Sequence, residues 1–242
     1  MGRYWDTSEN YSQPDTGKLQ GNAKATVKRE KAKGKTLNPI VIQGRKIVNS
    51  WWGQAWCDNL ERYADFESRL ERGKRYVRTG AVVDLEIQKG KVLARVQGRR
   101  KAPYKVEIRI SPLSEQRCQF AIEQCARKIE NLELLLQGNF PEELKELFRG
   151  EEGLFPSPKE ISFNCSCPDW ALMCKHVAAV LYGIGARFDE NPLLFFELRG
   201  IDVERFIDVT LGNRVEAMLK NADCASERII QSDHWEELFG VL

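Results

Sequence analysis

The sequence predicts an α+β protein: an antiparallel β-meander packed against a helix, plus a mostly helical half containing a small ββα-like zinc finger. Residues 80–110 alternate apolar and polar side chains with a period of two, which is typical of strands with one buried face. The stretches before and after them carry apolar residues at helical spacing. Three cysteines and one histidine cluster between residues 165 and 176, which adds a metal site to this fold class.

The composition indicates a globular protein with an uneven charge. Of its 242 residues 42% are hydrophobic, and no apolar run has the roughly twenty residues needed to span a bilayer. The polar start, MGRYWDTSEN, has no apolar signal segment, so we expect a cytoplasmic protein without membrane contact. Residues 1–110 hold 24 Lys and Arg against 12 Asp and Glu, whereas residues 111–242 hold 13 against 23. This split favours a basic half that faces a polyanion, although ordinary surface solvation also explains it.

The first segment, residues 1–46, is predicted to be a disordered basic arm because it is polar and has few apolar positions before Ile40. From Lys18 to Lys46 it holds nine basic residues and one acid. A flexible basic chain gains affinity for DNA or RNA by releasing counterions from phosphates. A solubilising tail is the competing interpretation.

The second segment, residues 47–110, is expected to combine a Trp-rich helix with the meander. Asn49 or Ser50 can cap a helix that runs to about Leu70, with an aromatic stripe that covers the buried face of the strands. A basic linker broken by Gly73 follows. The turn between the second and third strands carries three cations beside an aromatic residue. Five basic residues are therefore the candidate phosphate contacts: Arg75, Arg78, Arg99, Arg100 and Lys101.

The remaining chain is divided into three further segments. Residues 111–158 are predicted to be helical, with Cys118 and Cys125 as packed thiols on one face. Residues 159–188 contain the zinc finger, and residues 189–242 contain C-terminal helices and an apolar tail around Trp235. We expect this tail either to dock on the core of the protein or to bind a partner.

The candidate metal ligands are Cys165, Cys167, Cys174 and His176. Side chains two residues apart in an extended segment point the same way, so the first two cysteines can hold one ion from a strand end. Side chains two residues apart on a helix lie on opposite sides and cannot share an ion. Cys174 is therefore expected just before a helix, with His176 in its first turn. Three thiolates and one imidazole form a closed tetrahedral shell for a structural Zn²⁺. Packed core thiols, a disulfide and a catalytic Cys–His pair are the weaker alternatives.

The ligand motif also carries a resemblance. Cys165-Ser-Cys167 and Cys174-Lys-His176, followed by a small apolar helix, resemble the SWIM-type zinc finger. The flanks Trp51-Trp52-Gly53 and Leu198-Arg199-Gly200-Ile201-Asp202 are similar to bacterial SWIM proteins. The resemblance implies a partner, since members of that family are associated with helicase-like ATPases of the SWI/SNF superfamily.

These observations favour a non-enzymatic zinc-binding module that binds nucleic acid, acts as a helicase accessory, or both. The first alternative is a protein–protein adaptor that uses the acidic half and the apolar tail. The second is a metal hydrolase, for which Asp169 is the one carboxylate between the two ligand pairs. A closed four-ligand shell leaves no open metal position, so we expect no enzymatic activity.

Overall fold

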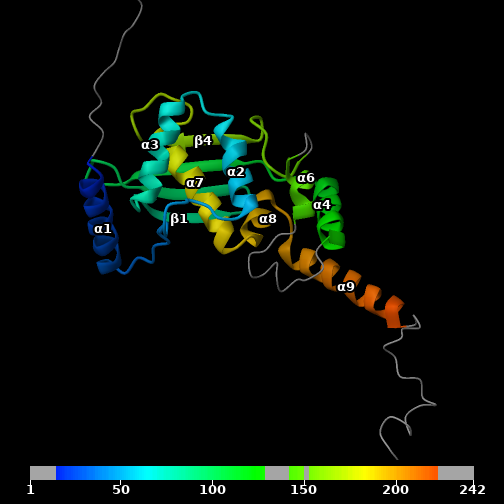
Figure 1. The fold of residues 1–242 in the computed structure, drawn as a ribbon. Helices are drawn as coiled ribbons and strands as arrows, with labels where there is room; N and C mark the ends of the chain where they lie inside the picture. The colour runs from blue at the N-terminus through cyan, green and yellow to red at the C-terminus, as the bar shows by residue number, and fades with distance from the viewer. Residues whose placement is uncertain (1–14, 129–141, 150–152, 223–242) are drawn as a thin grey trace, which may run out of the picture.

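The computed structural model describes residues 15–128, 142–149 and 153–222, and it shows a mixed α and β architecture, as the sequence predicts (Figure 1). Four antiparallel strands form one sheet in the order β1-β2-β3-β4. The strands are β1 (Val82–Gln88), β2 (Lys91–Val96), β3 (Tyr104–Ile110) and β4 (Ile161–Cys165). The helices within the described residues are α1 (Thr16–Ala32), α2 (Trp51–Glu61), α3 (Glu67–Arg78), α4 (Glu115–Lys128), η1 (Glu142–Leu144), α6 (Lys145–Arg149), α7 (Lys175–Glu190), α8 (Leu193–Arg199) and α9 (Val203–Ala222).

The predicted meander is confirmed, and a fourth strand extends it. Gly90 turns β1 into β2 at a φ of 67°, a conformation that suits a residue without a side chain. β4 pairs with β3, with Val106 opposite Cys165 and Ile110 opposite Ile161. The strand that carries the first metal ligand therefore belongs to the same sheet as the meander.

The helix that lies on this sheet is α7, and it contacts all four strands. Between His176 and Phe188, α7 has buried residues on most sides of the helix. The sheet covers one side, so other elements must pack against the opposite side. The α2 and α3 helices supply that cover. The indole N–H of Trp56 donates to the carbonyl oxygen of Leu181 over 3.0 Å, and that of Trp52 donates to Phe188 over 3.1 Å. Our expectation that the Trp-rich helix covers the meander is wrong, because α7 lies on the sheet and α2 packs on α7.

The Trp-rich segment forms two helices rather than the single one expected. Ser50 caps α2 by accepting a hydrogen bond from the backbone N–H of Gly53, as predicted. The chain then turns, and the Asp65 carboxylate accepts from the backbone N–H groups of Leu172 and Met173. The expected basic linker is instead α3. Gly73 lies inside this helix, at a position with no room for a side chain, because a Cβ there would lie only 2.5 Å from the Cβ of Ala178 in α7.

The prediction of a disordered arm is wrong for the described part of that segment. The α1 helix is capped at its start by Asp15, whose carboxylate accepts from the backbone N–H of Gly17. One face of the helix is buried, with residues spaced three and four apart: Leu19, Ala23, Thr26 and Glu30. Because two of these four buried residues are polar, the sequence of α1 looks like that of a solvated segment, and the helix is not predicted from it. Residues 1–14 lie outside the described residues.

The C-terminal part includes α4, α8 and α9. Cys118 and Cys125 are buried, as expected for packed thiols, whereas Phe120 is 56% exposed and does not share their face. The continuation of the predicted helix through residues 129–141 and the apolar tail at 223–242 lie outside the described residues. Within the part of the chain that the structure describes, no helix combines the length and hydropathy needed to cross a membrane.

The two flanking motifs hold the elements around the sheet together. Arg199 at the end of α8 is fully buried, and its guanidinium donates to the carbonyl oxygen of Ser111 and the carboxylate of Glu160, both over 2.8 Å. Gly53 lets α2 approach α7, because a Cβ there would lie 3.2 Å from the carbonyl oxygen of Gly185. Both motifs therefore have packing roles.

Candidate metal centre and the basic surface beside it

The four predicted metal ligands meet where β4 ends and α7 begins. Cys165 is the last residue of β4, and Cys167 follows two residues later. Cys174 is the N-cap of α7 with extended backbone angles, which places His176 in the first turn. The ligand atoms of all four residues lie within 4.8 Å of one another. This juxtaposition follows the local geometry that the spacing predicts.

The distances within this group suit a small divalent cation. The Nδ1 atom of His176 lies 3.9 Å from the sulfur of Cys165 and 4.0 Å from that of Cys174. In a tetrahedral zinc site with Zn–S of about 2.3 Å and Zn–N of about 2.0 Å, neighbouring ligand atoms are roughly 3.5–3.8 Å apart. A shift of a few tenths of an ångström would therefore bring His176 to the zinc-site spacing from these two sulfurs. Cys165, Cys167, Cys174 and His176 fit a bound metal ion.

The imidazole of His176 is held by aromatic rings. Tyr104 of β3 stacks on it at a centroid distance of 4.3 Å, and Tyr76 of α3 packs edge-on at 5.4 Å. The Nε2 atom is buried and has no hydrogen-bond partner among the described residues. It faces Gly98, where a Cβ would lie 3.6 Å from it. The ring is thus oriented by aromatic contacts from both tyrosines, with Nδ1 toward the thiols.

The protonation tendencies of the site also suit a cation. Burial lowers the pKa of His176, so the imidazole is neutral, as a metal ligand must be. The hydrogen bond to Cys174 and burial raise the pKa of Cys165, and burial raises that of Cys167. The pKa of Cys174 is lowered, chiefly by its hydrogen bond with Cys165. Thiols packed this closely oppose one another's ionisation, and a divalent cation offsets that opposition.

The loop between the two ligand pairs is fixed by the sheet and by α3. The backbone N–H of Ser166 donates to Lys105 over 3.0 Å. The guanidinium of Arg69 forms an ion pair with Asp169 over 3.2 Å, and the backbone N–H of Ala171 also donates to that carboxylate. Asp169, the one acid that a hydrolase would use, is therefore engaged in holding the loop.

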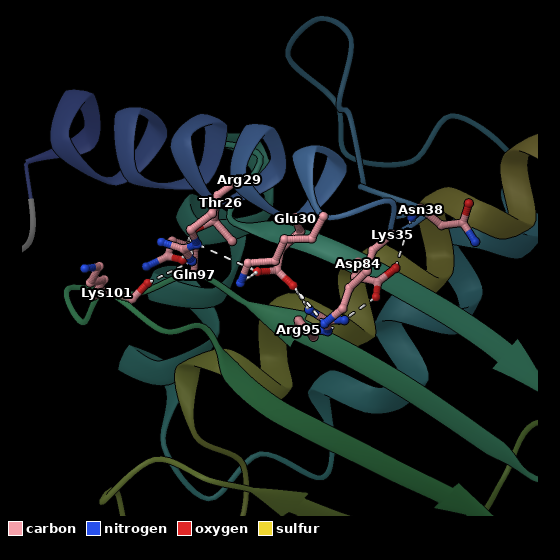
Figure 2. A network of polar contacts seen from close by, with 10 residues as sticks. Thr26, Arg29, Glu30, Lys35, Asn38, Asp84, Arg95, Gln97 and Lys101 are labelled. Carbon is pink, nitrogen blue, oxygen red and sulfur yellow. Dashed lines mark hydrogen bonds and ion pairs between the residues drawn. The ribbon is translucent and has the colours of Figure 1, made fainter.

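The α1 helix packs near the β2–β3 turn (Figure 2), and Gly98 of this turn lies beside the imidazole of His176. The exposed cations of α1 and of this turn are called the basic surface below. Thr26 donates to the side-chain oxygen of Gln97 over 2.7 Å, in a buried contact. The amide nitrogen of Gln97 donates in turn to the carbonyl oxygen of Arg100. The Arg29 guanidinium donates to the carbonyl oxygen of Lys101 over 3.3 Å. Two basic segments that lie some seventy residues apart in the sequence are thereby joined.

Glu30 is the acid at the centre of this network. Lys33 and Lys35 lie 3.2 Å and 3.1 Å from its carboxylate oxygens, and Arg95 of β2 lies at 3.3 Å. Hydrogen bonds from Lys35, then Lys33 and Arg95, lower its pKa to about 2. The carboxylate therefore remains ionised and holds α1 against the sheet.

The five predicted phosphate contacts occupy two elements. Arg99, Arg100 and Lys101 are exposed in the β2–β3 turn, and Arg100 lies over the ring of Tyr104 at 5.4 Å. Arg75 and Arg78 lie on α3, about 60° apart around the helix axis. Arg75 is half-buried and Arg78 is exposed. Sequence reasoning missed Arg29 as part of the ordered surface, because α1 was expected to be disordered.

Comparisons with known proteins agree with the ligand motif. The family model for the SWIM zinc finger matches residues 164–183. The chain is 33% identical over 183 residues to a protein of Mycobacterium tuberculosis (strain ATCC 25618 / H37Rv) described as uncharacterized protein Rv2102. That alignment covers 75% of this chain and 66% of the relative, so the chain spans just under two thirds of the relative's length. No solved structure matches. The segment that gathers the four metal ligands is thus similar to the SWIM zinc finger.

Proposed function

We propose that this protein is a non-enzymatic module, ordered by one structural Zn²⁺, that binds nucleic acid through the basic surface beside the metal centre. The observation that carries the proposal is the docking of α1 against the β2–β3 turn through Thr26, Gln97 and Arg29. Residues 16–35 hold seven basic residues and one acid, and the acid is Glu30, which is buried against the sheet. The exposed cations of α1 therefore add to those of the turn on a folded scaffold.

The donor set supports zinc as the ion and a structural role for it. Three thiolates and one imidazole suit zinc better than magnesium or calcium, which prefer oxygen ligands. Four protein ligands complete a tetrahedral shell, and Asp169 is paired with Arg69. This donor set and the pairing of Asp169 support a structural role for the ion rather than hydrolysis.

Salt dependence tests nucleic-acid binding. Removing one phosphate contact reduces the slope of log affinity against log salt by about 0.9 for duplex DNA and about 0.7 for a single strand. We expect the combined variant Arg99→Ala, Arg100→Ala and Lys101→Ala to weaken binding and to flatten this slope. A control variant removes the same charge from α9, where Arg205, Arg214 and Lys220 are exposed. Equal affinities and slopes for both variants and the wild type would show that the β2–β3 turn does not contact nucleic acid.

We also propose that the module acts as an accessory to a helicase-like ATPase of the SWI/SNF superfamily in the cytoplasm. The support is the resemblance of the motif and its flanks to bacterial SWIM proteins. Purification from native cells, with and without nuclease, tests this role. We expect such an ATPase to accompany the protein after nuclease treatment, and its absence from both preparations would contradict the accessory role.

A protein–protein adaptor is the second candidate, and one observation favours it. The α9 helix exposes an apolar stripe at Leu211, Val215, Met218 and Leu219, whose side chains are 46–64% exposed. These positions share one side of the helix. Binding to a protein that is insensitive to salt, together with no binding to DNA or RNA, would favour the adaptor.

A further inference from the structure

The loop between the two metal-ligand pairs presents an exposed aromatic residue. Trp170 is 80% exposed, and its ring contacts that of Phe66 edge-on at a centroid distance of 5.6 Å. Phe66 is itself 41% exposed, and nearby in the loop Leu172 is 65% exposed. Single exposed apolar residues are ordinary, but a group built around a tryptophan indicates a surface that binds something.

This loop position is held firmly. Asp65 accepts the backbone N–H groups of Leu172 and Met173, and Arg69 pairs with Asp169, the residue before Trp170. The ring of Phe66 supports the edge of the indole from the side of α3. The chain on both sides of Trp170 is thereby held in place, which reduces the entropy lost when a flat ligand stacks on the indole.

A series of cations leads from this platform to the basic surface described above. Arg69 lies 6.0 Å from the ring of Phe66. Arg72 and Tyr76 follow Arg69 on the same face of α3, at three and seven residues. Tyr76 packs edge-on against the imidazole of His176, and Tyr104, which has Arg100 over its ring, stacks on the same imidazole, so α3 and the β2–β3 turn meet here.

The series continues into the β2–β3 turn and α1. Arg100 lies over Tyr104, and the carbonyl oxygen of Lys101 accepts from Arg29 of α1. The acids of α3 lie elsewhere. Glu71 pairs with Lys74 over 3.2 Å. It lies about 150° around the helix axis from the face that Arg69 and Tyr76 share, so it does not interrupt the series of cations. We define the basic track as Arg72, Arg99, Arg100, Lys101 and Arg29, with Trp170 at its end.

We propose that the basic track binds a single strand of nucleic acid and that the indole of Trp170 stacks on one of its bases. This inference rests on the proposed function and specifies its ligand. A charged groove with an exposed aromatic is the general arrangement for single strands, since every base offers a π-face. The bases of a duplex are already stacked on one another, so Trp170 gains nothing from intact duplex.

The test compares Trp170→Ala with wild type on fluorescein-labelled (dT)15 and on a DNA duplex of the same length, by anisotropy. Base–aromatic stacking is worth about 1–3 kcal/mol, so we expect affinity for (dT)15 to fall by about 5- to 150-fold. Affinity for the duplex should change by less than about twofold, because no base is available for stacking. Trp170→Phe should restore most of the missing affinity. Phe120→Ala, which removes an exposed aromatic side chain on α4, should leave both affinities unchanged.

The outcomes separate this inference from the proposed function. Wild-type binding to both probes with no effect of Trp170→Ala would overturn stacking while leaving nucleic-acid binding intact, and Trp170 would then be assigned to a protein partner. An equal loss on both probes would also overturn it. Failure of the wild type to bind either probe would overturn the proposed function together with this inference.

Discussion

Gly73 of α3 and Ala178 of α7 are in direct contact, with no room for a side chain at the glycine. A Cβ at Gly73 would lie 2.5 Å from the Cβ of Ala178 and 3.0 Å from the backbone nitrogen of Ala179. This contact brings the basic helix α3 against the helix that carries Cys174 and His176. The metal centre and the basic surface are therefore parts of one packed unit.

Gly73→Ala should destabilise the protein. Alanine normally stabilises a helix interior, but the close approach to Ala178 forces the two helices apart, and such overpacking costs about 1–3 kcal/mol. Gly21→Ala is the matched control, because it also lies inside a helix and a Cβ there would meet no atom within 4 Å. That variant should gain about 0.5–1 kcal/mol. Urea denaturation measures both, and a Gly73→Ala variant as stable as Gly21→Ala would contradict the packing.

Chelation of the metal should destabilise the sheet as well as the finger. We expect this because β4 pairs with β3 and α7 contacts every strand, so the meander and the metal centre share one core. Thermal unfolding followed by far-ultraviolet circular dichroism should show one transition that moves to lower temperature with EDTA. The unfolding transition followed by tryptophan fluorescence should shift to the same lower temperature, because Trp56 packs on α7. Retention of the strand signal after the fluorescence transition would show that the meander folds independently.

Glu30→Gln should reduce stability at neutral pH and have no effect at very low pH. Lys35, Lys33 and Arg95 lower the pKa of Glu30 from its ordinary value of 4.5 to about 2. A lowered folded-state pKa stabilises the protein above the unfolded value and loses that contribution as pH falls through the folded value. The difference in melting temperature between wild type and variant should therefore be largest above pH 4.5 and should decrease as the pH falls toward 2. A difference that stays constant across this range would rule out the ion-pair network as its cause.

The sequence predicts the meander and the meeting of the four candidate ligands well because both signals are local. Alternation with a period of two specifies β1 to β3, and the four ligands fall within twelve residues on either side of a strand end and a helix start. Ser50 as the cap of α2 is local in the same sense. Such features depend on neighbours in the chain and need no knowledge of the tertiary structure.

The features that the sequence does not reveal depend on distant partners. The α1 helix buries Thr26 and Glu30, and these polar residues are satisfied by Gln97 and Arg95, more than sixty positions away. The break between α2 and α3 accompanies hydrogen bonds from the metal loop to Asp65. The spacing of apolar residues and the helix or strand propensity are properties of each segment alone, so neither could show these contacts between distant segments.

We propose that Cys165, Cys167, Cys174 and His176 hold one zinc ion that closes the junction of sheet and helix. Metal analysis of the purified protein by mass spectrometry tests this assignment, with Cys174→Ala compared against Cys118→Ala, which removes another buried thiol. We expect about one zinc per chain in the wild type and in Cys118→Ala, and a loss of most of it in Cys174→Ala. Equal zinc content in both variants, or no zinc in the wild type, would contradict the account.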